Sequence, residues 1–403
     1  MIRQLSIVTG LCALLCLGAA LAQQPQVRAD HPEEYVVKKG DTLWDIAGKF
    51  LVQPWHWPAI WQANPQIENP HLIYPGDRLK LVYVDGEPRL QVQRETERTV
   101  ERLSPRIRVE DEAVESIHMD AIAPFLSYPR VLQAEQFEQL AYVTANNERR
   151  IMAGPGDTTY VRGLPADADS GQYVIARLNY VYIVDDGGGS GRERDIDRYR
   201  VPRPNFTQRP HLRKPGLLEE IWRSIGRDEG DVVGYELWET GRAEVLQGGD
   251  PAVVRVIDSR REVRSGDYLI PAETHTYPGQ YIPSVMDDIP ADARVLSNIS
   301  QPQIQAHHQI VALNIGRREG VGPGHVFSVF HPGGRMPDPV AAPKGSWRRL
   351  MHVPEQINVD FPAEYAGHVM VFRSFEHVSY AMVMAGRREL REGDPLRHPD
   401  EPY

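Results

Sequence analysis

Paired carboxylates are the side chains of this sequence best suited to bond-breaking chemistry. They occur at Glu219 with Glu220, at Asp287 with Asp288, and at Asp195 with Asp197. A glycosidase needs two such groups held roughly 5 to 9.5 Å apart around the scissile bond. All three pairs lie in polar stretches, so solvated loops or faces explain them better than an active site does.

Signatures of metal-dependent or nucleophilic catalysis do not occur in the sequence. It contains no His-Glu-x-x-His, no His-x-His and no Ser-x-x-Lys. The adjacent His307 and His308 would point to opposite faces of a strand, which makes them poor ligands for one metal. We therefore predict a protein that is not an enzyme and carries no cofactor or metal. A hydrolase with an unrecognised active site between Ile107 and Tyr403 is the alternative.

The beginning of the chain predicts export from the cytoplasm. Arg3 precedes an apolar run that ends in Ala20-Leu21-Ala22, the small-residue pattern of a cleavage site. We predict a signal peptide over residues 1–22, cleaved between Ala22 and Gln23, and a mature chain in the periplasm with no membrane span. An uncleaved anchor is the alternative, although the run is shorter than the roughly 20 apolar residues of a typical span.

Cysteine content and charge narrow the function further. Both cysteines, Cys12 and Cys16, lie in the predicted signal peptide, so the mature chain carries no thiol for cysteine-dependent catalysis. The net charge of -10 becomes about -11 once Arg3 is removed. Such a chain offers no basic footprint for nucleic acid or anionic lipid. Neutral glycans and protein surfaces are the expected partners.

Residues 34–82 have the pattern of one small module. A short strand at Glu34 to Val37 ends at a glycine turn, and Asp41 or Thr42 can cap the helix that follows. A second helix is expected from about Trp55 to Asn64, with proline in its first turn. Pro75-Gly76 then turns the chain into a strand over Arg78 to Val84.

The stretches Lys39-Gly40-Asp41-Thr42-Leu43-Trp44 and Leu72-Ile73-Tyr74-Pro75-Gly76-Asp77 resemble the LysM family. This resemblance implies a βααβ fold that holds an N-acetylglucosamine-containing glycan, such as peptidoglycan, between the loop before the first helix and the loop before the last strand. The implied glycan-binding residues are Gly40, Asp41, Thr42, Leu43, Ile67, Asn69, Leu72, Ile73 and Tyr74.

Four of the seven tryptophans lie in this module and allow two interpretations. Sugar rings stack on exposed tryptophan, but a small domain also needs large side chains to build a core. We assign Trp44 and Trp61 to the core and leave Trp55 and Trp57 open between packing and glycan contact.

The remainder of the chain predicts a mainly β region, so the fold class is α+β. We expect a charged linker over residues 83–106, a β-rich middle domain over 107–290 with a mobile insertion near 185–214, and a carboxy-terminal β-barrel-like domain over 291–403. Minor helices are expected at Asp120 to Leu126 and Gln133 to Leu140. Glycine turns recur near residues 154, 264, 322 and 391, which indicates reused turn chemistry more than a structural repeat.

The stretch Ile310 to Phe330 looks like the β domain of certain flagellar outer-membrane-associated proteins. Together with the signal peptide and the amino-terminal module, it makes the whole chain similar to type IV pilus secretin-associated proteins. That resemblance implies a noncatalytic periplasmic anchor that joins an outer-membrane secretin to peptidoglycan. A wall-bound component of another envelope machine, such as the flagellum, is a further alternative.

Overall fold

The computed structural model describes residues 25–61, 73–93, 114–127, 129–165, 171–185, 195–200, 231–272, 280–299, 309–338, 340 and 358–402. The chain divides into two compact units. Unit 1 is Met1–Met119 with Gly279–Ser284, and unit 2 is Asp120–Pro278 with Val285–Tyr403. The predicted signal peptide lies outside the described residues. Within them, no helix has the length and apolar character needed to cross a bilayer.

Unit 1 contains the predicted strand, two helices and strand, followed by one strand more. Its elements are β1 (Tyr35–Val36), α2 (Leu43–Phe50), the 3₁₀ turn η1 (Pro54–His56), α3 (Trp57–Trp61), β2 (Arg78–Val84) and β3 (Glu87–Gln93). The three strands form one antiparallel sheet in the order β1-β2-β3. Leu43, Ile46 and Phe50 of α2 and Ile60 of α3 are buried in the core of the unit.

Strand β3 corrects the prediction of a charged linker from residue 83. Asp85 and Gly86 both adopt positive φ, 55° and 85°, and form the two-residue loop of a β-hairpin in which Val84 pairs with Glu87. This is the loop that the twist of antiparallel strands favours. Leu90 is 2% exposed in the core, and the residues at the two ends of β3, Glu87 and Gln93, are exposed.

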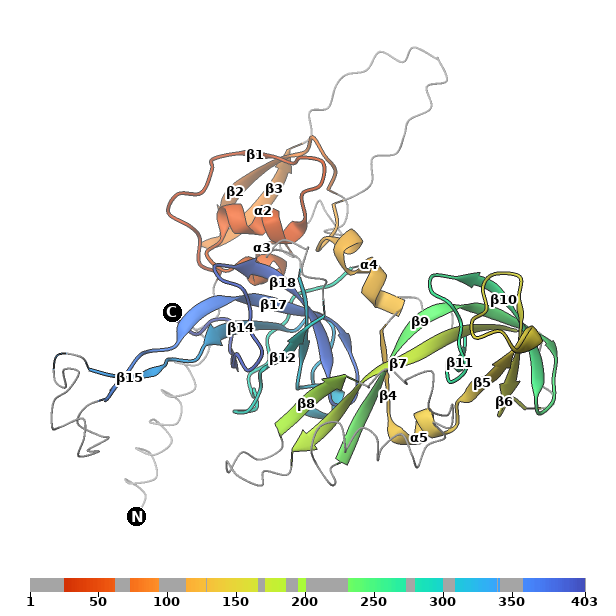
Figure 1. Ribbon diagram of the computed structural model, residues 1–403. Coiled ribbons are helices and arrows are strands. Elements are labelled where there is room, and N and C mark those ends of the chain that lie inside the picture. Colours follow the sequence, from red (N-terminus) through yellow and green to blue (C-terminus); the bar gives the residue numbers. More distant parts are fainter. Residues whose placement is uncertain are drawn as a thin grey trace, which may run out of the picture. The chain divides into compact units, whose positions relative to one another are not determined.

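The first part of unit 2 is a ring of six strands. They are β5 (Ala141–Asn146), β6 (Thr158–Arg162), β7 (Gln172–Asp185), β9 (Asp231–Gln247), β10 (Ala252–Ser259) and β11 (Tyr268–Pro271). Their hydrogen-bonded order is β5-β6-β10-β9-β7-β11, and β11 pairs with β5 again. Figure 1 shows β7 and β9 running side by side as the longest strands. Valine, alanine and leucine side chains fill the ring.

Two strands extend this ring, and two helices occur in the same stretch of the chain. Strand β4 (Arg130–Leu132) pairs with β9, and β8 (Asp195–Arg200) pairs with β7. Helices α4 (Met119–Ser127) and α5 (Ala134–Glu138) confirm the two predicted helices. Strand β8 differs from the expected mobile insertion over 185–214. Its backbone pairs with β7 from Tyr180↔Arg200 to Asp185↔Asp195.

A second ring follows in the same unit. Its strands are β12 (Val295–Asn298), β13 (Ile310–Leu313), β14 (Val326–His331), β17 (Glu364–Ser374), β18 (Ser379–Gly386) and β19 (Leu396–Arg397), in the order β12-β13-β18-β17-β14-β19. An antiparallel bridge between Arg294 and Pro395 joins the two edges. A short ribbon of β15 (Arg335–Pro337) and β16 (Asn358–Asp360) stands apart from this sheet. Strands β17 and β18 are largely buried, as their apolar sequence predicts.

The two rings have the same topology. When β5, β6, β7, β9, β10 and β11 are matched in chain order with β12, β13, β14, β17, β18 and β19, the spatial order is identical. All the neighbours are antiparallel in both rings. The sequence analysis explained the recurring glycine turns by reused turn chemistry, but the two rings also form a structural repeat. The boundary between two β domains stays a prediction, since both rings belong to one compact unit.

Five glycine turns in the described chain share one hydrogen-bond pattern, which includes a pair of backbone bonds to a neighbouring valine. They span Tyr74–Asp77, Gly154–Asp157, Arg264–Asp267, Gly322–His325 and Arg391–Asp394, and their third residue is always a glycine with φ between 86° and 99°. The fourth side chain accepts a hydrogen bond from the first residue's N–H at 2.8–3.1 Å. Each turn also exchanges two backbone hydrogen bonds with one buried valine: Val37, Val256, Val143, Val371 or Val295 respectively.

The positions of these turns show which of them belong to the structural repeat of the two rings. The Arg-x-Gly-Asp turns lie before β11 and β19 and attach to Val143 of β5 and Val295 of β12, which are matched positions in the two rings. The two Gly-Pro-Gly turns precede β6 and β14, which are not matched. One pair of turns thus belongs to the repeat, and the other reuses the same hydrogen-bond pattern elsewhere.

Gly316 gives a test of the second ring. A Cβ atom there would lie 2.5 Å from the carbonyl oxygens of both Phe375 and Glu376, whereas a Cβ at Gly322 would meet nothing within 4 Å. We expect Gly316→Ala to lower the free energy of unfolding by about 1–3 kcal/mol through overpacking. Gly322→Ala is the matched control and should cost little. Urea unfolding of both variants checks this, and equal midpoints would contradict it.

Candidate functional site

The first predicted rim of the glycan site is the loop before α2. Gly40 has a φ of 91°, and the Asp41 N–H donates to the Lys38 carbonyl at 3.2 Å to close the turn. The Asp41 carboxylate accepts hydrogen bonds from the Lys38 N–H and the Tyr35 hydroxyl, both at 2.8 Å. Burial and this carboxylate raise the pKa of Tyr35 to about 12. Asp41 therefore holds the loop in shape.

Thr42 and Leu43 begin the helix and are buried, with 2% and 1% of their surface exposed. The Thr42 hydroxyl accepts a hydrogen bond from the Asp45 N–H, and the Asp45 carboxylate accepts one from the Thr42 N–H. This reciprocal capping satisfies two amides of the first turn and leaves others directed outward. The N–H of Leu43 is among those left for another partner.

The second predicted rim lies just before β2. Ile73 is fully buried and Tyr74 is partly exposed. The Tyr74 N–H donates to the Asp77 carboxylate at 3.1 Å, which fixes the turn that leads into β2. Three other predicted contact residues, Ile67, Asn69 and Leu72, lie outside the described residues.

A segment of the chain itself lies between the two rims. We call this segment, Val114–His118, the strap. The Leu43 N–H donates to the Glu115 carbonyl at 2.8 Å, and the Val114 N–H donates to the Ile73 carbonyl at 2.8 Å. Thr42 and Glu115 form a parallel bridge. The structure thus brings the two rims together across the strap, with Thr42 and Leu43 on one side and Ile73 on the other.

Side chains also fix the strap. Val114, Ser116 and Ile117 are 5%, 1% and 1% exposed, and Val114 belongs to the core of the module. The Ser116 hydroxyl accepts a hydrogen bond from the Tyr281 N–H at 2.8 Å, so a distant segment of unit 1 holds the strap. Sequence reasoning missed this segment, since its apolar residues are few and its partners lie far away in the chain.

The last strap residue reaches the capping carboxylate of α2. His118 Nε2 lies 3.2 Å from Asp45 Oδ2. Burial acts to raise the pKa of Asp45, but hydrogen bonds from His118 and Thr42 outweigh it and lower that pKa. Asp45 therefore stays ionised and links the strap to the rim that it covers.

The four tryptophans of the module are all buried. Trp44 and Trp55 are each 4% exposed, Trp57 is 2% and Trp61 is 3%. The assignment of Trp44 and Trp61 to the core is confirmed, and the open question for Trp55 and Trp57 is answered in favour of packing. None of the four presents a ring face on which a sugar could stack.

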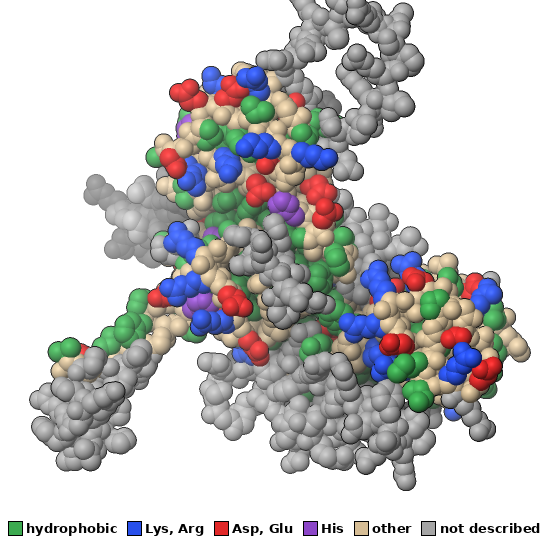
Figure 2. Space-filling view, turned by 45° about the horizontal axis from the view of Figure 1, so that its top comes forward, with side chains coloured by type: hydrophobic (Ala, Val, Ile, Leu, Met, Phe, Trp, Pro, Cys, Tyr) green, Lys and Arg blue, Asp and Glu red, His purple; other side chains and the backbone are tan. Residues whose placement is uncertain are grey.

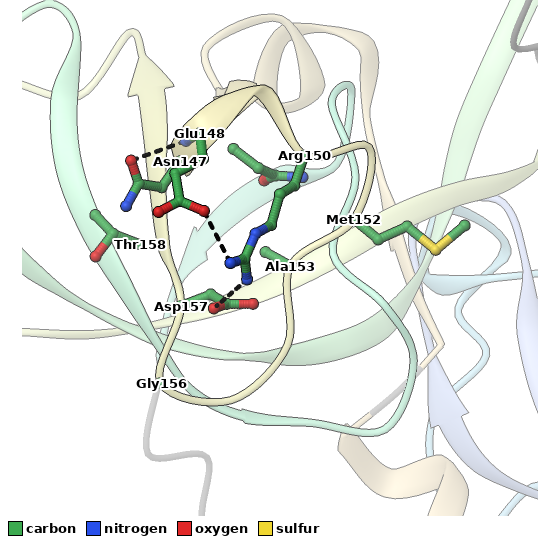
Figure 3. A pocket seen from close by; sticks show the side chains of 9 residues that line it. Asn147, Glu148, Arg150, Met152, Ala153, Gly156, Asp157 and Thr158 are labelled. Atoms are coloured by element: carbon green, nitrogen blue, oxygen red, sulfur yellow. Dashed lines mark hydrogen bonds and ion pairs between the residues drawn. The ribbon is translucent and has the colours of Figure 1, made fainter.

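A polar pocket of about 190 Å³ lies on the first ring, between η2 (Asn147–Arg149) and the turn before β6. Figure 3 shows the Arg150 guanidinium between two carboxylates of this pocket. It lies 2.8 Å from Glu148 and 3.5 Å from Asp157. Because both carboxylates are paired with the same cation, neither is arranged as the proton donor that glycosidic cleavage requires.

A serine and a histidine meet inside the second ring. Ser328 Oγ lies 3.0 Å from His368 Nε2, and the Tyr365 hydroxyl contacts His368 Nδ1. The pair resembles a nucleophile and its base, a candidate that the sequence search missed because Ser328 and His368 lie on different strands. Ser328 is fully buried and His368 is 3% exposed, so a substrate has no access to them in this structure. Burial lowers the pKa of His368 to about 4.

The other candidates for chemistry are scattered. Asp287 and Asp288 are exposed, and Asp195 and Asp197 lie on edge strand β8. His307, His308, Glu219 and Glu220 lie outside the described residues. The part of the chain that the structure describes holds no cluster of three potential metal ligands. On the face drawn in Figure 2, acidic and basic side chains alternate and do not form a patch of one sign.

Comparison with known proteins assigns the module. Residues 35–82 match the LysM domain. The chain is 45% identical over 60 residues to the uncharacterized protein YqbP of Bacillus subtilis (strain 168), which covers 12% of this chain and 27% of that protein. It is 40% identical over 68 residues to the uncharacterized protein CPj0593/CpB0616 of Chlamydia pneumoniae, or 17% of each. The chain thus spans less than a third of either relative.

Proposed function

We propose that this protein is a noncatalytic wall-binding protein of the periplasm that attaches an outer-membrane secretin, that of type IV pili, to peptidoglycan. The LysM domain at residues 35–82 carries the proposal, because LysM is a binding domain and supports peptidoglycan binding. The attachment to a secretin rests on the resemblance of the whole chain, which combines the predicted signal peptide, the amino-terminal module and the stretch Ile310 to Phe330. Many copies of the protein around the circular secretin would bind the wall together, so that glycan contacts that are weak individually become effective.

The geometry of the two rims supports the glycan part of the proposal. An acetamido group offers one N–H and one carbonyl, and needs an acceptor and a donor held at a fixed separation. The Ile73 carbonyl and the Leu43 N–H are such a pair, and both residues are buried and held by turn and cap. Buried backbone groups of this kind give orientation and specificity to a small-ligand site.

Retention on purified sacculi tests the proposal. The full mature chain should bind sacculi and be released by chitotetraose, the tetramer of N-acetylglucosamine. Cellotetraose, which lacks the acetamido groups, should not release it. Failure to bind would overturn the wall-binding function. Release of soluble muropeptides would instead favour the hydrolase.

The partner is tested separately by crosslinking in cells. The expected product joins this chain to an outer-membrane secretin, identified by mass spectrometry of the crosslinked peptides. A crosslink to a flagellar or other envelope component, with none to a secretin, would replace the proposed partner while leaving wall binding intact.

A further inference from the structure

The strap makes the hydrogen bonds that an acetamido group would make in the groove. Its Glu115 carbonyl accepts from the Leu43 N–H, and its Val114 N–H donates to the Ile73 carbonyl, each at 2.8 Å. Two peptide groups of the strap, one on each side of the peptide bond between Val114 and Glu115, thus satisfy both rims, and the Val114 side chain packs in the core of the module. A sugar and the strap cannot use the same two backbone groups at once.

We propose that the strap is a built-in competitor that occupies the glycan groove of the resting protein and must leave before the glycan binds. This inference rests on the proposed wall-binding function and adds its regulation. Because the strap belongs to the same chain, it competes at a fixed effective concentration that no dilution removes. Glycan affinity is then set by the fraction of molecules in which the strap is undocked.

The contacts at the ends of the strap indicate how it is held. At one end Val114 is packed in the core of unit 1. At the other, His118 contacts Asp45, and the Tyr281 N–H binds the Ser116 hydroxyl. Weakening these contacts should raise the undocked fraction without touching either rim, since Leu43 and Ile73 contribute only backbone groups to the exchange.

The double variant Val114→Asp with Ile117→Asp tests the proposal in the full mature chain. Burying two carboxylates is unfavourable, so the strap should undock. If the undocked fraction is about 1–10% in the unaltered protein, affinity for chitotetraose should rise about tenfold or more. The matched control is Val36→Asp with Val84→Asp, which makes the same charge change at residues of unit 1 that are 45% and 40% exposed. It should bind like the unaltered protein.

Hydrogen exchange on the unaltered protein gives a measurement that needs no variant. Saturating chitotetraose should speed exchange of the Val114 amide, which loses the Ile73 carbonyl, while the Leu43 amide stays protected by its new partner. Two affinity results would count against the strap proposal: equal affinity of all three proteins, or loss of binding by the strap variant. Either result, combined with unchanged exchange of the Val114 amide, would overturn the strap proposal and leave the wall-binding function standing. If none of the proteins binds chitotetraose or sacculi, the wall-binding function itself fails.

Discussion

Replacing Arg177 by Met is expected to lower the free energy of unfolding of the first ring by about 3–5 kcal/mol, because it leaves a buried carboxylate without its countercharge. Arg177 Nε and Nη2 donate to the two oxygens of Asp267 at 2.7 and 2.8 Å. The Asp267 side chain is 2% exposed. Burial raises the pKa of Asp267, and the guanidinium acts against that rise.

The position of Asp267 explains why this pair matters. Its carboxylate also accepts a hydrogen bond from the Arg264 N–H at 2.8 Å, which closes the glycine turn that joins β11 to Val143 of β5. Loss of the ion pair therefore weakens one closing contact of the ring. The double variant Arg177→Met with Asp267→Asn should recover part of the loss, since a neutral amide is less costly to bury.

Urea titration with pulse proteolysis measures this effect, and fragment masses assign each transition to its part of the chain. Arg162→Met is the matched control, because Arg162 makes a similar two-bond pair with Asp250 at 3.1 and 3.0 Å on the surface. Exposed pairs contribute little, so its unfolding midpoint should not move measurably. An equal shift in the two variants would contradict the role given to burial.

Stability of the second ring is expected to fall as the pH decreases from about 6.5 to 4. His368 is buried, and its pKa of about 4 lies below the ordinary value of 6.5. In this window the unfolded chain binds more protons than the folded one, so protonation favours unfolding. The difference in pKa corresponds to about 3 kcal/mol by pH 4, at about 1.4 kcal/mol per unit.

Two variants check the sign of the effect. His368→Gln should remove this part of the pH dependence, as measured by urea midpoints at several pH values. Asp400→Asn should lower the pKa of His368 further, because the negative charge of Asp400 raises it. Nuclear magnetic resonance titration of the imidazole gives that pKa directly. A value near 6.5 would show that the imidazole is accessible to solvent and reopen a catalytic role for Ser328.

Local signals account for what the sequence predicted well. The glycine turn at Gly40, the cap at Thr42 and the Pro75-Gly76 turn each act over a few residues, so the helices and strands of the LysM module follow from them. Strand β3 also has a local signal, since Asp85-Gly86 is a hairpin loop. The charged residues that follow the loop led to the prediction of a linker, although Leu90 in the second strand of the hairpin is buried.

Contacts between distant parts of the chain account for what was missed. The strap pairs Glu115 with Thr42, and no pattern in either stretch points to the other. Closure of the first ring depends on β7 pairing with β9, and that of the second on a single bridge between Arg294 and Pro395. The glycan-binding role of the two rims therefore stays a prediction, while the strap between them could be found only from the tertiary structure.

The location of the strap bears on domain dissection. A fragment ended after β3 at Gln93 would keep all three strands and both helices, whereas one trimmed to the matched residues 35–82 would also lose β3. Both fragments would lack Val114, which packs in the core of the unit, and Tyr281, whose N–H binds the strap at Ser116. Sugar affinity measured on such a fragment would describe the two rims without the strap. The apolar surface that the strap leaves exposed would also favour self-association of the fragment.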